Sequence, residues 1–130
     1  MMERAGNQKV SGIQMNAPVA AGEFIKKTDM VALNQEGYLV KAAKAEGLRV
    51  VGIATDNADN RMGTDGAEAV SFTSGGFVFN QEGIKETDLM RTAYIKDAAT
   101  VTTSSVGSSV VGKIMEVDAT CAAVLIQPYR

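Results

Sequence analysis

The stretch "RVVGIAT", residues 49–55, is the clearest strand in the sequence because it is apolar and rich in β-branched residues. Its Val-Val-Gly triplet returns at 110–112 inside "SSVVGKIM", residues 108–115. Each copy is followed by a loop and then by a strand centred on Ala-Val, "AEAVSF" at 67–72 and "CAAVLI" at 121–126. The second half of the chain therefore repeats an arrangement of strands that is already present in the first.

A second motif precedes each of these segments: "IKKTD" at 25–29 and "IKETD" at 84–88. Similar motifs in the same order at nearly the same spacing indicate a duplicated β unit, with halves of about 22–79 and 81–127. We expect the two Val-Val-Gly triplets to occupy equivalent strands. The Ile-Lys-x-Thr-Asp motif is then part of the scaffold rather than a functional site.

Composition and length favour strands joined by tight turns in one domain. The 130 residues are 45% hydrophobic, with 13 glycines, no tryptophan and only 5% aromatic residues. A half of this size is marginally stable alone, so the two halves should share a core. We predict an all-β fold, a compact β-sandwich or β-barrel-like domain at residues 18–130 made of two fused similar units. An extended N-terminal arm at residues 1–17 precedes it.

Charge and residue types argue against several functional classes. A net charge of −2 and a pI near 5.1 give no basic surface for nucleic acid. With no histidine, the chain lacks the commonest general base and metal ligand, and its one cysteine, Cys121, excludes an internal disulfide framework. The longest uncharged apolar stretch, "ATCAAVLI" at 119–126, is too short to cross a bilayer. We expect a protein that is not an enzyme, needs no cofactor, binds no membrane and is made in a reducing cytoplasm.

The polar stretch "DNADNRMGTDG", residues 56–66, is the best candidate for a site. Its aspartates and asparagines carry the oxygen atoms that calcium prefers. Their spacing matches no known calcium loop, and no glutamate stands in the closing position of an EF-hand. A solvated connecting loop is the favoured interpretation, and a calcium-dependent binding module is the less favoured alternative.

The order of motifs in "GEFIKKTDMVALNQEGYLVKA…RVVGIAT", which begins at Gly22, resembles that of capsid decoration (cement) proteins of tailed bacteriophages. The second half is similar, with the Tyr-x-x-Asp, Thr-Val-Thr and Val-Gly-Lys elements of "DLMRTAYIKDAATVTTSSVGSSVVGKIMEVD", residues 88–118. The resemblance covers about residues 18–128. It implies an all-β, often trimeric protein without catalytic activity, bound through the major capsid protein to the exterior of the virion and made in the host bacterial cytoplasm. Another phage structural part, such as a tail or fibre-attachment module, is the alternative.

Two segments lie outside the shared pattern, and we predict that both contact capsid subunits or a neighbouring copy. The arm alternates apolar and polar residues over a short stretch, which suits an extended segment that adds to a sheet edge of a partner. The 56–66 loop is the longest insertion in the ordered part of the chain. The predicted contact residues are Arg4, Lys9, Val10, Ile13 and Met15 in the arm, and Asn57, Asn60, Arg61 and Met62 in the loop.

Overall fold

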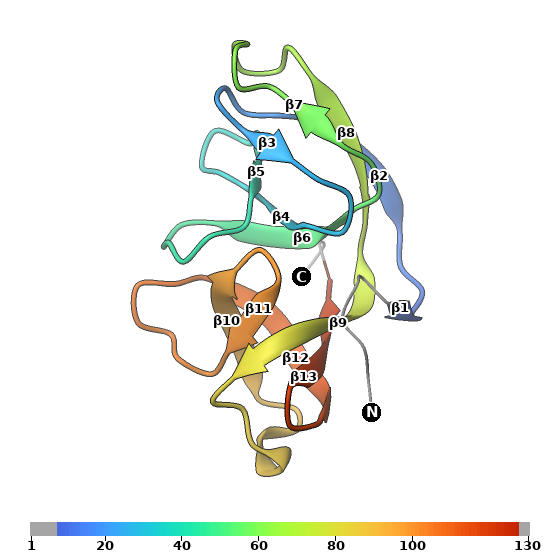
Figure 1. The fold of residues 1–130 in the computed structure, drawn as a ribbon, viewed down its shortest axis with the longest axis vertical. Helices are drawn as coiled ribbons and strands as arrows, with labels where there is room; N and C mark the ends of the chain where they lie inside the picture. Colours follow the sequence, from blue (N-terminus) through green and yellow to red (C-terminus); the bar gives the residue numbers. More distant parts are fainter. Residues whose placement is uncertain (1–7, 128–130) are drawn as a thin grey trace.

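The computed structural model describes residues 8–127, which fold into strands and one short 3-10 helix (Figure 1). The strands are β1 (Gln8–Val10), β2 (Gln14–Pro18), β3 (Phe24–Ile25), β4 (Met30–Leu33), β5 (Leu39–Lys41), β6 (Arg49–Ala54), β7 (Ala58–Asp59), β8 (Ala69–Thr73), β9 (Gly75–Glu82), β10 (Thr92–Asp97), β11 (Thr100–Thr102), β12 (Val110–Val117) and β13 (Cys121–Ile126). The helix is η1 (Glu86–Asp88). The predicted all-β class is confirmed.

The second half forms a closed five-stranded barrel. Its strands pair in the order β9, β13, β12, β10 and β11, and β11 returns to β9 as a parallel neighbour. Val101 is opposite Gln81 in this closing pair. Closure leaves the barrel without free sheet edges, and in Figure 1 it fills the lower part of the molecule, from yellow to red.

The first half, in the upper part of Figure 1, has the same strand order and closes through a shorter contact. Its strands pair in the order β2, β8, β6, β4 and β5, and a parallel bridge between Val19 and Leu39 joins the last strand to the first. The amide of Ala20 also donates to the carbonyl of Leu39, at 2.9 Å. The fold is therefore two barrels in one chain.

The two barrels have one topology. In each, the first strand along the chain pairs with the fifth, the fifth with the fourth, the fourth with the second, the second with the third, and the third runs parallel to the first. The registers also agree: Leu33 is opposite Leu39 in the first barrel, and Ile95 is opposite Val101 in the second. The prediction of two fused similar β units is confirmed.

The Val-Val-Gly triplets occupy the fourth strand of each barrel, as the duplication requires. Each forms a β-bulge against the second strand, where Val51 and Val111 are the extra residues. The glycine that follows lies so close to the fifth strand that a Cβ on Gly52 would overlap with the carbonyl oxygen of Thr73. A Cβ on Gly112 would overlap in the same way with the carbonyl oxygen of Leu125. Glycine is required at both positions because the backbones meet there.

The Ile-Lys-x-Thr-Asp motifs form the same turn twice. The Asp29 carboxylate accepts from the amide of Lys26 at 2.9 Å, and the Asp88 carboxylate accepts from the amide of Lys85 at 2.8 Å. Ile25 and Ile84 are both buried. The motif is a structural turn, although the second copy continues through additional residues before its strand begins.

Equivalent positions fill the two interiors. The inward-facing residues of the first barrel have apolar counterparts in the second. Where one barrel has a large residue, the other often has a small residue at the equivalent position. The pairs are Met15 and Phe77, Ala17 and Phe79, Val31 and Ala93, Leu33 and Ile95, Leu39 and Val101, Val51 and Val111, Ala54 and Ile114, Val70 and Ala122, and Phe72 and Val124.

The outward face of β4 and β6 joins the two barrels. Met30, Ala32, Val50 and Ile53 are buried together with the interior residues of the second barrel rather than with those of their own. This apolar contact makes the two halves one body, as expected for units too small to be stable alone.

The boundaries of the units differ from those drawn on the sequence. Strand pairing divides the chain near Ser74 rather than near residue 80. Gln14–Pro18 is the first strand of a barrel, although residues up to 17 were expected in an arm. β1 pairs with β9 of the second barrel. The amide of Ile13, between β1 and β2, donates to the hydroxyl of Ser74, between β8 and β9, at 2.8 Å. The part of the arm within residues 8–127 is therefore built into both barrels, so deleting residues 2–15 would remove part of the fold.

Candidate functional site

The connection between β6 and β8 is organised by Asn60, whose side chain is 2% exposed. Its amide nitrogen donates to the carbonyls of Val19 and Ala20, each at 3.1 Å, and to that of Thr64 at 2.9 Å. Asn60 was predicted to contact a partner, but its buried side-chain amide instead ties the loop to the segment that follows β2. The burial of Asn60 could not be predicted from the sequence, because its neighbours in the 56–66 loop are polar as well.

An aromatic and charged cluster lies beside this residue, on the two-stranded ribbon of β3 and β7. The Arg61 guanidinium lies 4.2 Å from the centre of the Phe24 ring, within cation–π range. It also donates to both carboxylate oxygens of Asp59, at 2.9 and 2.7 Å. These hydrogen bonds lower the pKa of Asp59 to about 2 and raise the pKa of Arg61. Lys26 and Lys41 approach the same ring, at 5.4 and 5.9 Å.

Two other predicted residues of the loop have different environments. Met62 is 99% exposed, next to Arg61 in sequence, and offers an apolar side chain to a partner. The Asn57 side-chain oxygen accepts from the backbone amide of Lys27 at 2.8 Å, so it holds the loop to the turn before β4. Of the predicted contact residues in this loop, Arg61 and Met62 have exposed side chains that no backbone hydrogen bond ties into the loop.

The loop aspartates accept hydrogen bonds from different parts of the chain. Asp56 accepts from the amide of Asn57, Asp65 accepts from the amide of Ala21, and Asp59 is paired with Arg61. Within residues 8–127, no group of three or more acidic, histidine or cysteine side chains is placed to hold a metal ion. The calcium alternative therefore has no geometric support in the described part of the chain.

The predicted arm residues do not form one surface. Arg4 lies outside the described residues, and Lys9 and Val10 belong to β1, which pairs with β9. Met15 is partly buried against the interior of the first barrel, and its predicted contact with a partner stays a prediction. Ile13 remains 50% exposed.

A second group of exposed apolar side chains was not predicted from the sequence. Leu89 and Met90, which follow η1, are 52% and 69% exposed, and Val106 in the β11–β12 loop is 74% exposed. The turn around η1 forms the lower tip of the molecule in Figure 1, and the β7–β8 loop that carries Met62 forms the upper tip. A signal was present in "DLMRT", residues 88–92, where apolar residues follow a turn motif.

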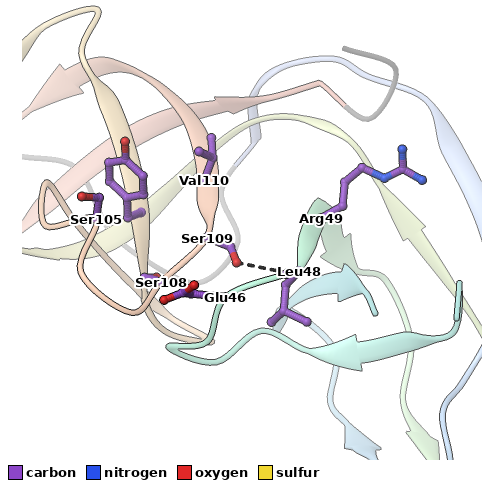
Figure 2. A pocket seen from close by; sticks show the side chains of 9 residues that line it. Glu46, Leu48, Arg49, Ser105, Ser108, Ser109 and Val110 are labelled. Atoms are coloured by element: carbon purple, nitrogen blue, oxygen red, sulfur yellow. Dashed lines mark hydrogen bonds between the residues drawn. The ribbon is translucent and has the colours of Figure 1, made fainter. Parts of the chain in front are cut away.

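A groove of about 560 Å³ lies where the barrels meet (Figure 2). The first barrel contributes Glu46, Leu48 and Arg49, and the second contributes Tyr94 and Val110 with three serines. Two of these serines are structural donors: Ser108 donates to the carbonyl of Ile95 and Ser109 to that of Ala45, each at 2.6 Å. The groove thus offers one exposed wall from each barrel.

Comparison with known proteins gives no relative: no family model, no curated protein and no solved structure matches this chain. No helix among the described residues has the length and apolar character needed to cross a membrane.

Proposed function

We propose that this chain is a structural protein of a bacteriophage virion, which binds the outer surface of the assembled head and stabilises it by bridging capsid subunits. The observation that carries the proposal is the placement of exposed apolar side chains at both ends of an elongated body. The β7–β8 loop at one tip carries Met62, and the segment after η1 at the other tip carries Leu89 and Met90. Exposed methionines and leucines at projecting tips suit contacts with other proteins.

A bridge needs its two contacts at a fixed separation. The barrels supply this because they share the buried residues Met30, Val50 and Ile53 at their junction. When one tip is bound, the second tip binds as an intramolecular event, but only where the lattice places a subunit within reach. The protein then binds the assembled shell more tightly than free subunits, and by mass action this difference stabilises the shell.

Binding to purified heads tests the proposal, with heads assembled from the major capsid protein encoded in the same genome. Cosedimentation should give saturable occupancy on heads and weak binding to free subunits. Met62→Glu and Met90→Glu should each lower the affinity for heads at least about tenfold, a loss of about 1.4 kcal/mol. Val106→Glu is the matched control because Val106 is exposed too, at 74%, but belongs to the β11–β12 loop rather than to either tip segment.

Each outcome bears on a separate part of the proposal. No binding to heads would reject the capsid role, and full occupancy of both tip variants would reject the bridging contacts. A copy number of only a handful per particle would assign the chain to a tail or fibre-attachment module. The trimer implied by the sequence resemblance is checked by electron microscopy of decorated heads.

A further inference from the structure

The contact between the barrels has two sides that differ in kind. The first barrel contributes a face, the outward side of β4 and β6. The second contributes one end of the barrel, where its interior residues meet that face. Polar contacts fix the arrangement: the amide of Met30 donates to the carbonyl of Ala98 at 2.9 Å, and the amide of Leu48 donates to the hydroxyl of Ser109 at 3.1 Å. A face therefore meets an end, and the two surfaces are not alike.

Because the barrels share one topology, the second barrel has its own version of this face. Register assigns Thr92, Tyr94, Val110 and Lys113 as the counterparts of Met30, Ala32, Val50 and Ile53. The residues in the first barrel are at most 3% exposed, whereas Val110 is 36% exposed and Lys113 is exposed. The four counterparts line the groove of Figure 2 and two adjoining grooves of about 640 and 150 Å³. We call this surface the β10–β12 face.

The first barrel has an end equivalent to the covered end of the second barrel, but no other barrel packs against it. In the second barrel, where the end is covered, Phe77 is 2% exposed and Ile95 is fully buried. Their counterparts Met15 and Leu33 are partly exposed although they belong to the interior of the first barrel. The turn between β4 and β5 lies at this end of the first barrel. In this turn Glu36 is at the position equivalent to Ala98 in the second barrel. We call this surface the β4–β5 end.

We propose that the β10–β12 face of one molecule binds the β4–β5 end of a second copy of this chain. The contact would repeat between molecules the arrangement that joins the two barrels within one. The face continues directly into the existing junction, because its groove is lined by Glu46 and Leu48 of the first barrel as well as by Tyr94 and Val110. Such a contact is head-to-tail, so it leaves one free face and one free end in every dimer.

The residues that differ between the two faces indicate a weaker, reversible contact. Two apolar residues, Met30 and Ile53, are replaced by Thr92 and Lys113 on the second barrel. In the arrangement that mirrors the internal junction, Lys113 lies near the turn that carries Glu36, so opposite charges meet. A polar rim around Tyr94 and Val110 is typical of interfaces that form and dissociate. This self-association does not require the proposed capsid role, although Met90 of the lower tip also lines the groove of about 640 Å³.

Sedimentation velocity of the full chain at increasing concentration tests the proposal. The unmodified protein should show mass growing beyond the dimer as its concentration rises to about 1 mM. Tyr94→Asp, which alters only the face, and Leu33→Gln, which alters only the end, should each weaken association about tenfold or more. An equimolar mixture of the two should recover dimers but nothing longer, since each dimer uses the one intact face and the one intact end.

Met62→Glu is the control, because Met62 is 99% exposed but lies on neither surface, and it should associate like the unmodified protein. If a core-facing variant fails to fold, the exposed variants Lys113→Glu on the face and Glu36→Arg on the end replace the first pair. Mixing them places the new glutamate opposite the new arginine, so opposite charges meet and association should return. A protein that stays monomeric at every concentration would overturn the proposal. So would a mixture that gains nothing over either variant alone, because a symmetric contact between identical patches behaves in that way.

Discussion

The two barrels of this chain share their strand order and registers but differ in the connection between their fourth and fifth strands. In the first barrel, this connection runs from Thr55 to Glu68, includes β7 and is held by buried Asn60. In the second, it is a tight turn in which the Asp118 carboxylate accepts from the amides of Thr120 and Cys121, at 2.9 and 2.8 Å. The barrel is thus the constant part of the design, and the connection is the variable part.

This difference separates what folds the protein from what it presents to partners. The inward-facing residues and the bulge glycines recur in both halves, so they specify the barrel. The exposed residues at the tips lie on different connections: Met62 is on the connection between the fourth and fifth strands of the first barrel, and Met90 on the connection between the first and second strands of the second. Loops carried by a rigid scaffold are the usual place for binding residues.

The largest effect is expected where the two barrels are most alike, at the bulge glycines. Gly52→Val and Gly112→Val should each destabilise the fold by about 4 kcal/mol or more, because the new side chain overlaps with a backbone carbonyl of the fifth strand. Gly37→Ala is the control: its φ of +90° disfavours a side chain, but nothing lies within 4 Å, so about 1 kcal/mol is expected. Urea unfolding measures all three, and a mild effect at either bulge would break the equivalence of the barrels.

A smaller effect should follow from Asn60→Ala, which acts on the connection found only in the first barrel. Three hydrogen bonds are lost, although each acceptor carbonyl keeps a backbone donor, from Gly66, Glu23 or Ala67. At about 0.5–1.5 kcal/mol per hydrogen bond, a cost of about 1–3 kcal/mol is expected. Asn57→Ala, which removes one exposed hydrogen bond, should cost less than about 1 kcal/mol. Thermal unfolding compares the two, and limited proteolysis should cut Asn60→Ala first within residues 56–66. Equal stability of the two variants would show that the loop is not organised by Asn60.

The smallest effect concerns the Asp59–Arg61 pair on the same connection. The folded-state pKa of Asp59 is about 2, below its ordinary value of 3.8. The pair therefore favours the folded state above the ordinary pKa, and this contribution is lost as the pH falls through about 2. Both side chains are at least half exposed, so solvent weakens the contribution to stability. An NMR titration of the Asp59 carboxyl should have its midpoint near 2, and Arg61→Gln should return it toward 3.8; an unchanged midpoint would contradict the assigned cause.

Sequence reasoning found the constant part of the molecule and missed much of the variable part, for physical reasons. The Val-Val-Gly triplets were informative because a close backbone approach allows only glycine at Gly52 and Gly112. The closure of the first barrel was invisible because it depends on a contact between Val19 and Leu39, which local pattern does not encode. Residues 14–17 were expected in an arm because their partner strand, β8, lies far along the chain.

The repeated Ile-Lys-x-Thr-Asp motif also shows a limit of sequence matching. It repeats a local turn, but the hydrogen bonds to the fourth strand align Thr28 with Met90 rather than with Thr87. The amide of Thr28 donates to the carbonyl of Ala54, and that of Met90 donates to the carbonyl of Ile114. Both residues have a positive φ, 77° and 67°. Aligning the two sequence motifs therefore identifies the duplicated unit correctly but misaligns the residues just before the second strand of each barrel.

The central claim, that one closed barrel has been built twice, is tested most directly by NMR at the closing strand pairs. Cross-strand NOEs should connect Val19 with Leu39 in the first barrel and Gln81 with Val101 in the second. We expect both sets, along with matching contacts of Leu33 with Leu39 and of Ile95 with Val101. A chain in which one closing pair shows no NOE while the other does would have one barrel and one open sheet, and this result would contradict the duplication of a closed unit.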